Sequence, residues 1–229
     1  MSNVAIITAR GGSKRIPRKN IKEFCGKPII AYSIEAALKS GVFDEVMVST
    51  DSEEIKCISE KCGAKVPFLR SENTSNDFAT SAGVIAEVLH SYLDIGKAFD
   101  CFACIYPTAP FLTAERLFEA VSSLEDADAV VSVVKYSFPP QRAFLINDGI
   151  VSYQFPEYEK IRSQDLEPIY HDCGQFYICN TNAFMKNHSL ILPRTKPYII
   201  PEEEVQDIDT MSDWIIAEAK FSVLHGGRK

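Results

Sequence analysis

The sequence lacks the features that mark membrane and secreted proteins. None of its apolar runs approaches the roughly 20 residues that span a bilayer. The first apolar run is too short and too soon interrupted for a signal peptide. The seven cysteines are an odd number, which is not typical of a disulfide framework. We therefore expect a cytoplasmic protein with reduced, mostly buried thiols and no membrane partner.

The chain also lacks an excess of positive charge. It has 24 Lys and Arg against 31 Asp and Glu, a net charge of −7, which argues against nucleic acids and anionic membranes as partners. A cationic cluster near the N-terminus instead indicates an anionic small molecule. Seven cations fall within the first 27 residues: Arg10, Lys14, Arg15, Arg18, Lys19, Lys22 and Lys27.

One cysteine pair has the spacing of a metal or redox motif. Cys101 and Cys104 form a C-x-x-C, but they lie in an apolar run that reads as a strand. Side chains alternate along a strand, so the two sulfurs are expected on opposite faces of the sheet. This argues against a zinc or redox role for the pair.

Strand-like and helix-like segments alternate through most of the chain. This rhythm predicts an α/β fold with a mostly parallel sheet and helices on both faces. The length suits one domain, residues 1–229. Thr210 is expected to cap the last helix, with Asp213 at the third helical position completing a capping-box-like pair. Strands are predicted at 3–9, 45–49, 64–68, 100–106, 129–134, 174–179 and 196–200, and helices at 28–39, 52–61, 78–93, 113–124 and 211–224.

The rhythm breaks between residues 138 and 172. This segment is rich in proline, glutamine, aromatic and charged residues, and contains the turn sequence Asn147-Asp-Gly149. We interpret it as an excursion from the domain, used for dimerisation or as a lid over a substrate.

A basic loop with two glycines, residues 10–20, follows the first predicted strand. Open α/β sheets bind ligands at the carboxyl ends of their strands. Gly11 and Gly12 allow backbone amides to approach an anion. Arg10, Lys14 and Lys19 can neutralise a triphosphate, and Ser13 can donate a hydrogen bond. The loop matches neither the P-loop nor the G-x-G-x-x-G pattern. The alternative is a solvated basic loop.

Asp207 and Asp209 are spaced to place both carboxylates on one face of an extended segment. Neighbouring carboxylates repel each other unless a cation lies between them. Magnesium prefers oxygen ligands and commonly combines one or two carboxylates with substrate phosphates. The alternative is an acidic turn in which Asp209 serves the N-terminus of the following helix. Together with the basic loop, the pair favours a Mg²⁺ site, with Mn²⁺ as a possible substitute.

These motifs resemble those of a known family. Ala9-Arg-Gly-Gly-Ser-Lys14 and Ile16-Pro-Arg-Lys-Asn20 are similar to the CTP-binding signature of the acylneuraminate cytidylyltransferases, which activate sialic acid and its relatives as CMP-sugars. The resemblance extends over nearly the whole chain and implies a Rossmann-like nucleotide-diphospho-sugar transferase fold and a homodimer. Further similar elements are Val48–Asp51, Phe68–Arg70, Asn76-Asp77, Thr80-Ser81, Tyr106–Pro110 and Asp207–Asp209.

The resemblance also implies roles for individual residues. It makes Arg10, Lys14 and Asp209 catalytic, with Asp207 and Asp209 binding the metal. The nucleotide-binding residues are Ala9, Arg10, Gly11, Gly12, Ser13, Lys14, Lys19, Asn20, Arg70, Asp77 and Ser81, of which Arg70, Asp77 and Ser81 contact cytosine or ribose.

The expected sugar site departs from the sialate enzymes. Those enzymes typically have an Arg-Pro-Asn-Gly-like stretch where this chain has Tyr170–Tyr177, and a glutamine where it has Tyr106. This combination resembles the branch that uses pseudaminic acid. Arg162 is the candidate for the sugar carboxylate, because a guanidinium binds a carboxylate bidentately. The substrate-binding candidates are Tyr106, Thr108, Arg162, Gln164, His171 and Gln175.

The predicted reaction is attack of the anomeric hydroxyl of a nonulosonic acid on the α-phosphate of CTP, which gives a CMP-sugar and pyrophosphate. Catalysis is expected to rest on positioning and charge neutralisation rather than on a covalent intermediate. Two alternatives stay open. The sugar could be sialic acid, legionaminic acid or the eight-carbon acid KDO, and the chain could be a nucleotide-binding regulatory module without turnover.

Overall fold

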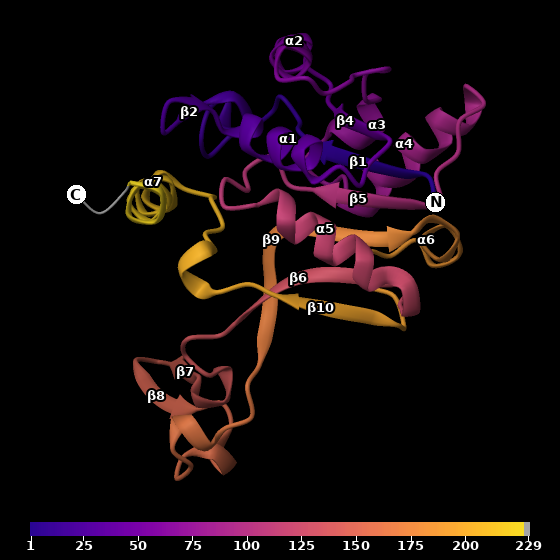
Figure 1. Cartoon of the computed structure of the whole chain (residues 1–229). Coiled ribbons are helices and arrows are strands. Elements are labelled where there is room, and N and C mark those ends of the chain that lie inside the picture. The colour runs from indigo at the N-terminus through magenta and orange to yellow at the C-terminus, as the bar shows by residue number, and fades with distance from the viewer. Residues whose placement is uncertain (227–229) are drawn as a thin grey trace.

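The apolar runs form a six-stranded sheet in the computed structural model, which describes residues 1–226 (Figure 1). The strand order is β10-β6-β9-β5-β1-β4. β1 is parallel to β4 and β5, β10 is parallel to β6, and β9 runs antiparallel between β5 and β6. The prediction of a mostly parallel sheet is confirmed. The strands are β1 (Asn3–Thr8), β4 (Glu45–Ser49), β5 (Cys101–Ile105), β6 (Ala129–Lys135), β9 (Tyr170–Asn180) and β10 (Thr195–Ile199).

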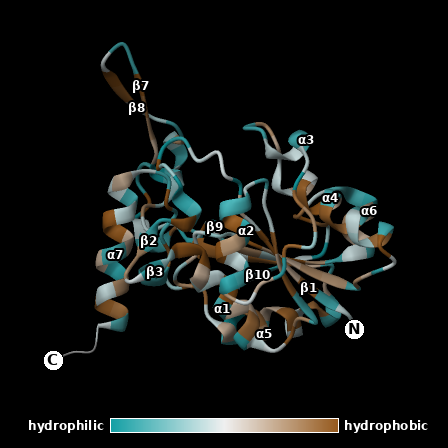
Figure 2. Cartoon of the chain, turned by 90° about the horizontal axis from the view of Figure 1, so that it is seen from above, coloured by the Kyte–Doolittle hydropathy of each residue, from teal (hydrophilic) through white to brown (hydrophobic). Residues whose placement is uncertain are grey.

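Helices cover both faces of this sheet, as predicted (Figure 2). α1, α2 and α5 pack on one face, and α4 and α6 pack on the other. Among residues 1–226, no helix combines the length and the apolar character that a bilayer crossing requires. The helices are α1 (Ile29–Ser40), α2 (Glu53–Lys61), α3 (Glu72–Ser75), α4 (Ser81–Asp94), α5 (Ala114–Ser122), α6 (Thr181–Asn187) and α7 (Met211–His225).

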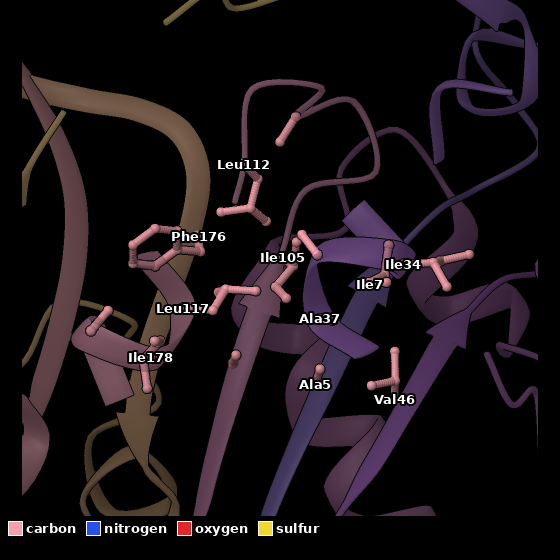
Figure 3. Close-up of a cluster of buried hydrophobic side chains, with 14 of the residues drawn as sticks. Ala5, Ile7, Ile34, Ala37, Val46, Ile105, Leu112, Leu117, Phe176 and Ile178 are labelled. Carbon is pink, nitrogen blue, oxygen red and sulfur yellow. The ribbon is translucent and has the colours of Figure 1, made fainter. Parts of the chain in front are cut away.

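Alternation along the strands divides the core into two layers. Figure 3 shows the layer beneath α1 and α5, where Ile7 of β1 and Ile105 of β5 share a cluster with Ile34 of α1. Burial of each such side chain stabilises the fold by about 1.5–3 kcal/mol. Cys101 belongs to this layer and Cys104 to the layer on the other face. The two sulfurs therefore lie on opposite faces, as expected.

Three elements differ from the sequence prediction: a strand, the start of a helix and an additional helix. Residues 64–68 form no strand, and only Lys65 makes a bridge, to Met47 of β4. The reason is Pro67, which has no amide hydrogen for a ladder. α4 begins at Ser81 rather than near residue 78, because the side chain of Thr80 caps it by accepting from the Gly83 amide. α6 was not predicted.

The excursion forms an arm that projects from the sheet (Figure 1). Its hairpin consists of β7 (Phe144–Asn147) and β8 (Ile150–Tyr153). The turn residues Asp148 and Gly149 have φ values of 51° and 78°, as a type I′ hairpin turn requires. His171 and Asp172 already belong to β9, so the sheet resumes before the predicted end of the excursion.

A third apolar cluster connects the two motif segments. It contains Ile16 of the basic loop and Ile208, which lies between the two aspartates, together with Phe24 and Trp214. Phe24 lies on the short hairpin of β2 (Glu23–Phe24) and β3 (Lys27–Pro28), and Trp214 lies on α7. The predicted capping box of Thr210 and Asp213 is present and fixes the start of α7. This packing brings the basic loop and the aspartate segment to one edge of the sheet.

Candidate nucleotide-binding site

A cavity of about 230 Å³ opens at the carboxyl ends of β1 and β5. Thr8 ends β1, and Tyr106 follows β5 directly. This is the edge at which open α/β sheets bind ligands. The lining residues are Thr8, Arg10, Ser13, Lys14, Arg15, Ile16, Lys19, Asn20, Arg70, Ala79, Ser81, Val84, Tyr106, Pro107, Thr108 and Asp209.

One wall of the cavity is the basic loop. Asn20 shapes this loop, because its side-chain amide donates to the Arg10 carbonyl at 2.9 Å. Arg10 Nη1 lies 2.8 Å from Asp77 Oδ1, and Lys14 Nζ lies 2.5 Å from Asp77 Oδ2. The hydrogen bonds from Lys14 and Arg10 lower the pKa of the Asp77 carboxyl. Asp77 therefore contacts the predicted phosphate-binding cations.

The glycines do not both behave as predicted. The Gly11 amide donates to Asp51 Oδ1 at 2.7 Å, so it is engaged within the protein rather than offered to an anion. A Cβ at this position would lie 3.2 Å from Ser52 Cβ, which explains why a glycine fits here. Ala9 is fully buried, and its amide donates to the Ser49 carbonyl. Ser13 lines the cavity, whereas neither glycine does.

Arg70 and Ser81 line the side of the cavity predicted for cytidine. Arg70 is only 9% exposed. Its Nε donates to Ser49 Oγ at 3.0 Å, and its Nη2 donates to the Ser49 carbonyl at 2.6 Å. Burial lowers the pKa of Arg70, and the nearby Asp51 carboxylate opposes that shift. The guanidinium is thus held rigidly at the cavity wall.

Asp209 lines the same cavity and contacts the basic loop. Arg15 Nη2 lies 2.8 Å from Asp209 Oδ1. Lys19 Nζ donates to the Ile208 carbonyl at 2.6 Å and lies 3.5 Å from the same Asp209 oxygen. The basic loop is therefore bonded directly to the aspartate segment, and both line the cavity.

The two aspartates have the chemistry of a partial metal site. Ile208 is fully buried between them, which leaves Asp207 and Asp209 on the other side of the extended segment. The pKa of Asp207 is raised by partial burial of its carboxyl and by the negative charge of Asp209, and a cation would relieve this repulsion. Residues 1–226 contain no group of three or more His, Cys, Asp or Glu that could hold a metal. Asp209 lines the cavity, whereas Asp207 does not. Two carboxylates are the kind of ligand that magnesium combines with substrate phosphates.

Four of the six predicted sugar-binding residues do not reach this cavity within one chain. Tyr106 and Thr108 line it. Arg162 pairs with Asp165 in the arm, Gln164 lines a separate cavity of about 310 Å³, and the exposed His171 packs against Tyr136. Gln175 is buried and donates to the Glu204 carbonyl at 2.9 Å. Its Oε1 has no hydrogen-bond partner within residues 1–226, and its contact with the sugar stays a prediction.

Some lining residues were absent from the predicted site. Arg15 belonged to the recognised cationic cluster, so its charge was a usable signal. Ala79, Val84 and Pro107 have no such signal, because they contribute only apolar surface. Their positions follow from the way α4 and the segment after β5 pack at the sheet edge.

Comparison with known families shows which family the chain belongs to. The family model for cytidylyltransferases matches residues 4–198, which include β1, the basic loop, Arg70, Ser81 and Tyr106. The chain belongs to the cytidylyltransferase family. It is therefore an enzyme of the CTP-utilising nucleotidyltransferase class.

Individual relatives support this membership. The pseudaminic acid cytidylyltransferase of Campylobacter jejuni is 41% identical over 98% of each chain. The CMP-N,N′-diacetyllegionaminic acid synthase of Legionella pneumophila is 36% identical over 95% of each chain. The N-acylneuraminate cytidylyltransferase of Escherichia coli is 34% identical over 93% of this chain and 51% of that protein.

Two solved structures of other enzymes share the fold of this cytidylyltransferase. A CMP:2-keto-3-deoxy-manno-octonic acid synthetase complexed with CTP aligns with a TM-score of 0.71 at 18% identity, over 98% of this chain and 100% of the other. A 4-diphosphocytidyl-2C-methyl-D-erythritol synthase from Anaerococcus prevotii aligns with a TM-score of 0.67, also at 18% identity, over 96% and 98% of the two chains. At this identity the match concerns the fold alone, and the predicted nucleotide-diphospho-sugar transferase fold is confirmed.

Proposed function

We propose that this cytidylyltransferase transfers CMP from CTP to the anomeric hydroxyl of a nonulosonic acid, namely pseudaminic acid, with release of pyrophosphate. The observation that carries the proposal is that the basic loop and Asp209, which are bonded to each other, line one cavity at the carboxyl ends of β1 and β5. The pseudaminic acid and legionaminic acid enzymes named above, both of which are named for nonulosonic acids, align with nearly the whole chain.

The residues divide the work by position. Arg10 and Lys14 bind the triphosphate and offset the charge that develops on the departing pyrophosphate. Arg70 and Ser81 hold the cytidine end, and the rigid anchoring of Arg70 on Ser49 fixes its direction. In-line attack then depends on holding the sugar hydroxyl close to the α-phosphate.

Asp209, with Asp207 beside it, is the proposed magnesium ligand. Bound magnesium would polarise the phosphate oxygens and stabilise charge in the transition state. Arg15 and Lys19 hold Asp209 at the cavity wall. Because Lys19 also holds the Ile208 carbonyl, the aspartate segment keeps its position relative to the basic loop.

The choice of sugar rests on two supports. The pseudaminic acid enzyme of Campylobacter jejuni is more similar to this chain than the legionaminic and N-acylneuraminic acid enzymes named above, at 41% against 36% and 34% identity. Tyr106 occupies the position at which sialate enzymes typically have a glutamine. It lines the cavity together with Thr108. A changed side chain at this wall fits a changed sugar.

Turnover with a panel of sugars tests this proposal. The protein is incubated with CTP, Mg²⁺ and pseudaminic, legionaminic, N-acetylneuraminic acid or KDO, and pyrophosphate release is measured. We expect the highest kcat/KM with pseudaminic acid, because the pocket that selects it is the part that departs from the sialate enzymes. A higher kcat/KM with another acid contradicts the choice of sugar, and no release with any acid contradicts the enzymatic proposal.

We further propose that the enzyme works as a cytoplasmic homodimer joined through the arm. The hairpin exposes Ile146 and Ile150, at 71% and 72% of their surface, and apolar surface of this extent favours a protein partner. Arg162 lies in the same arm and does not reach the cavity of its own chain. Its predicted contact with the sugar carboxylate therefore requires the cavity of a second copy.

Substitution of Ile146 tests the dimer. Ile146→Asp places a charge on the exposed hairpin without disturbing the sheet core, so we expect a dimer to become a monomer by size-exclusion chromatography with light scattering. Phe118→Asp is the control, because Phe118 is an exposed apolar residue on α5, outside the arm. A monomeric wild-type protein, or an Ile146→Asp protein that remains dimeric, contradicts this interface.

A further inference from the structure

The cations of the basic loop already have a carboxylate partner in the protein itself. Asp77 spans both of them, with one oxygen 2.8 Å from Arg10 Nη1 and the other 2.5 Å from Lys14 Nζ. Asp77 comes from the segment between α3 and α4, more than 60 residues further along the chain. The two ion pairs therefore connect the basic loop to the segment that leads into α4.

The segment that carries Asp77 is fixed to α4 on both sides. Before it, the Ser71 amide and hydroxyl and the Thr74 hydroxyl donate to the Glu87 carboxylate of α4. After it, the Phe78 amide donates to Asn76 Oδ1 at 2.9 Å, and Thr80 caps α4. The aspartate is thus presented by a tight, anchored turn, while its partners are long flexible side chains that can move away from it.

The cavity lining carries an excess of positive charge, and the Asp77 carboxylate lies next to two of its cations. Within residues 1–226, five cationic side chains line the cavity against one carboxylate, that of Asp209. Asp77 therefore offsets part of this positive charge when no anion is bound. A triphosphate needs the same two cations, and its charge repels a carboxylate that stays beside it.

We propose that Asp77 is an internal competitor for the triphosphate: it holds Arg10 and Lys14 in the empty enzyme, gives them up to CTP, and takes them back as pyrophosphate leaves. This inference rests on the proposed function, since it assumes that the cavity binds CTP. It assigns Asp77 a positioning role in substrate entry and product release, which differs from the predicted contact with cytosine or ribose.

The test compares Asp77→Asn with wild type in binding inorganic pyrophosphate and CTP by calorimetry, with and without Mg²⁺. Removing the competing charge is expected to tighten the binding of both ligands by roughly three- to tenfold, as suits two exposed ion pairs. Asp77→Glu keeps the charge and is expected to bind much as wild type does. In turnover, Asp77→Asn should show a lower KM for CTP and stronger product inhibition by pyrophosphate.

Glu72→Gln is the matched control. Glu72 is an exposed carboxylate on the same segment, and it makes no ion pair within residues 1–226. We expect its substitution to change pyrophosphate affinity less than twofold. Unchanged or weaker binding of pyrophosphate and CTP by Asp77→Asn overturns the inference, as does an equal gain in Glu72→Gln.

The two proposals fail separately. Absence of pyrophosphate release from CTP with every sugar counts against the proposed function, whatever Asp77 does. A wild-type enzyme that turns over CTP, combined with an Asp77→Asn enzyme of unaltered affinity and unaltered product inhibition, removes only the competitor role.

Discussion

Replacement of Asp209 by asparagine is expected to lower kcat by roughly 10²–10³-fold, the loss typical of removing one electrostatic contact to a transition state. Asp209 lines the cavity and lies beside the raised-pKa carboxyl of Asp207. The amide keeps the shape of the side chain but loses the negative charge that would hold a divalent cation. Steady-state kinetics over a range of Mg²⁺ concentrations, with CTP and the preferred sugar, measure the effect.

Two controls separate this role from folding. Glu203→Gln makes the same chemical change at an exposed carboxylate near Asp209 in sequence, one without an ion pair in the described part of the chain. It should retain wild-type kcat. The thermal unfolding midpoint of Asp209→Asn should remain near that of wild type, because the apolar contacts of Ile208 and the cap of α7 stay in place. Near-normal kcat of Asp209→Asn at saturating Mg²⁺ contradicts the assigned role.

The second large effect is on stability. Glu45, the first residue of β4, is 5% exposed, and its carboxylate accepts hydrogen bonds from Tyr92, Lys65 and Lys97. Tyr92 belongs to α4, the helix that also holds the Asp77 segment. Burial of the carboxyl acts to raise its pKa, but the hydrogen bonds from Lys97, Tyr92 and Lys65 together outweigh it and lower the pKa of Glu45 to about 2. From that shift, Glu45→Gln should reduce the free energy of unfolding at pH 7 by about 2–3 kcal/mol.

The sign of the pH dependence follows from the direction of the shift. A carboxyl whose pKa is lowered on folding stabilises the protein above its unfolded value, near 4.5, and that contribution is lost as the pH falls toward about 2. Urea unfolding at a fixed protein concentration should therefore show a wild-type advantage at pH 7 that shrinks below pH 4.5. Glu60→Gln, at an exposed position of α2, should change stability by less than about 0.5 kcal/mol. A Glu45→Gln protein as stable as wild type at pH 7, or a difference that does not change with pH, contradicts this account.

Local patterns predicted the parts of the site that depend on short stretches of chain. The β-branched run of β1 leads directly into the basic loop, and both prediction and structure place this loop at the strand's carboxyl end. The spacing of Asp207 and Asp209 around an apolar residue predicted a shared face, and the buried Ile208 agrees with it. Such features follow from the periodicity of side chains along the backbone, which can be read directly from the order of residues in the sequence.

Contacts across the sheet could not be predicted in this way. The pairing of Asp77 with Arg10 and the hydrogen bond from the Gly11 amide to Asp51 both depend on which strands are neighbours. Periodicity predicts that β1, β4 and β5 exist, but it does not supply their order.

The sugar-binding candidates show a second limit. His171 and Gln175 were chosen because they lie in the stretch Tyr170–Tyr177, where this chain departs from the sialate enzymes. In the structure, Gly174 adopts a φ of 66°, and the pairing of β9 with β6 shifts register between Val131 and Val133. This irregularity breaks the simple alternation of side chains. His171 consequently lies exposed near Tyr136, and Gln175 lies buried.

A crystal structure with CTP and Mg²⁺ bound tests the central claim most directly. The account predicts the triphosphate in the cavity lined by the basic loop and Asp209, with a metal ion roughly 2.1 Å from an aspartate oxygen and the cytidine end against Arg70 and Ser81. Nucleotide bound at another place, with Asp207 and Asp209 far from any ligand, would contradict it.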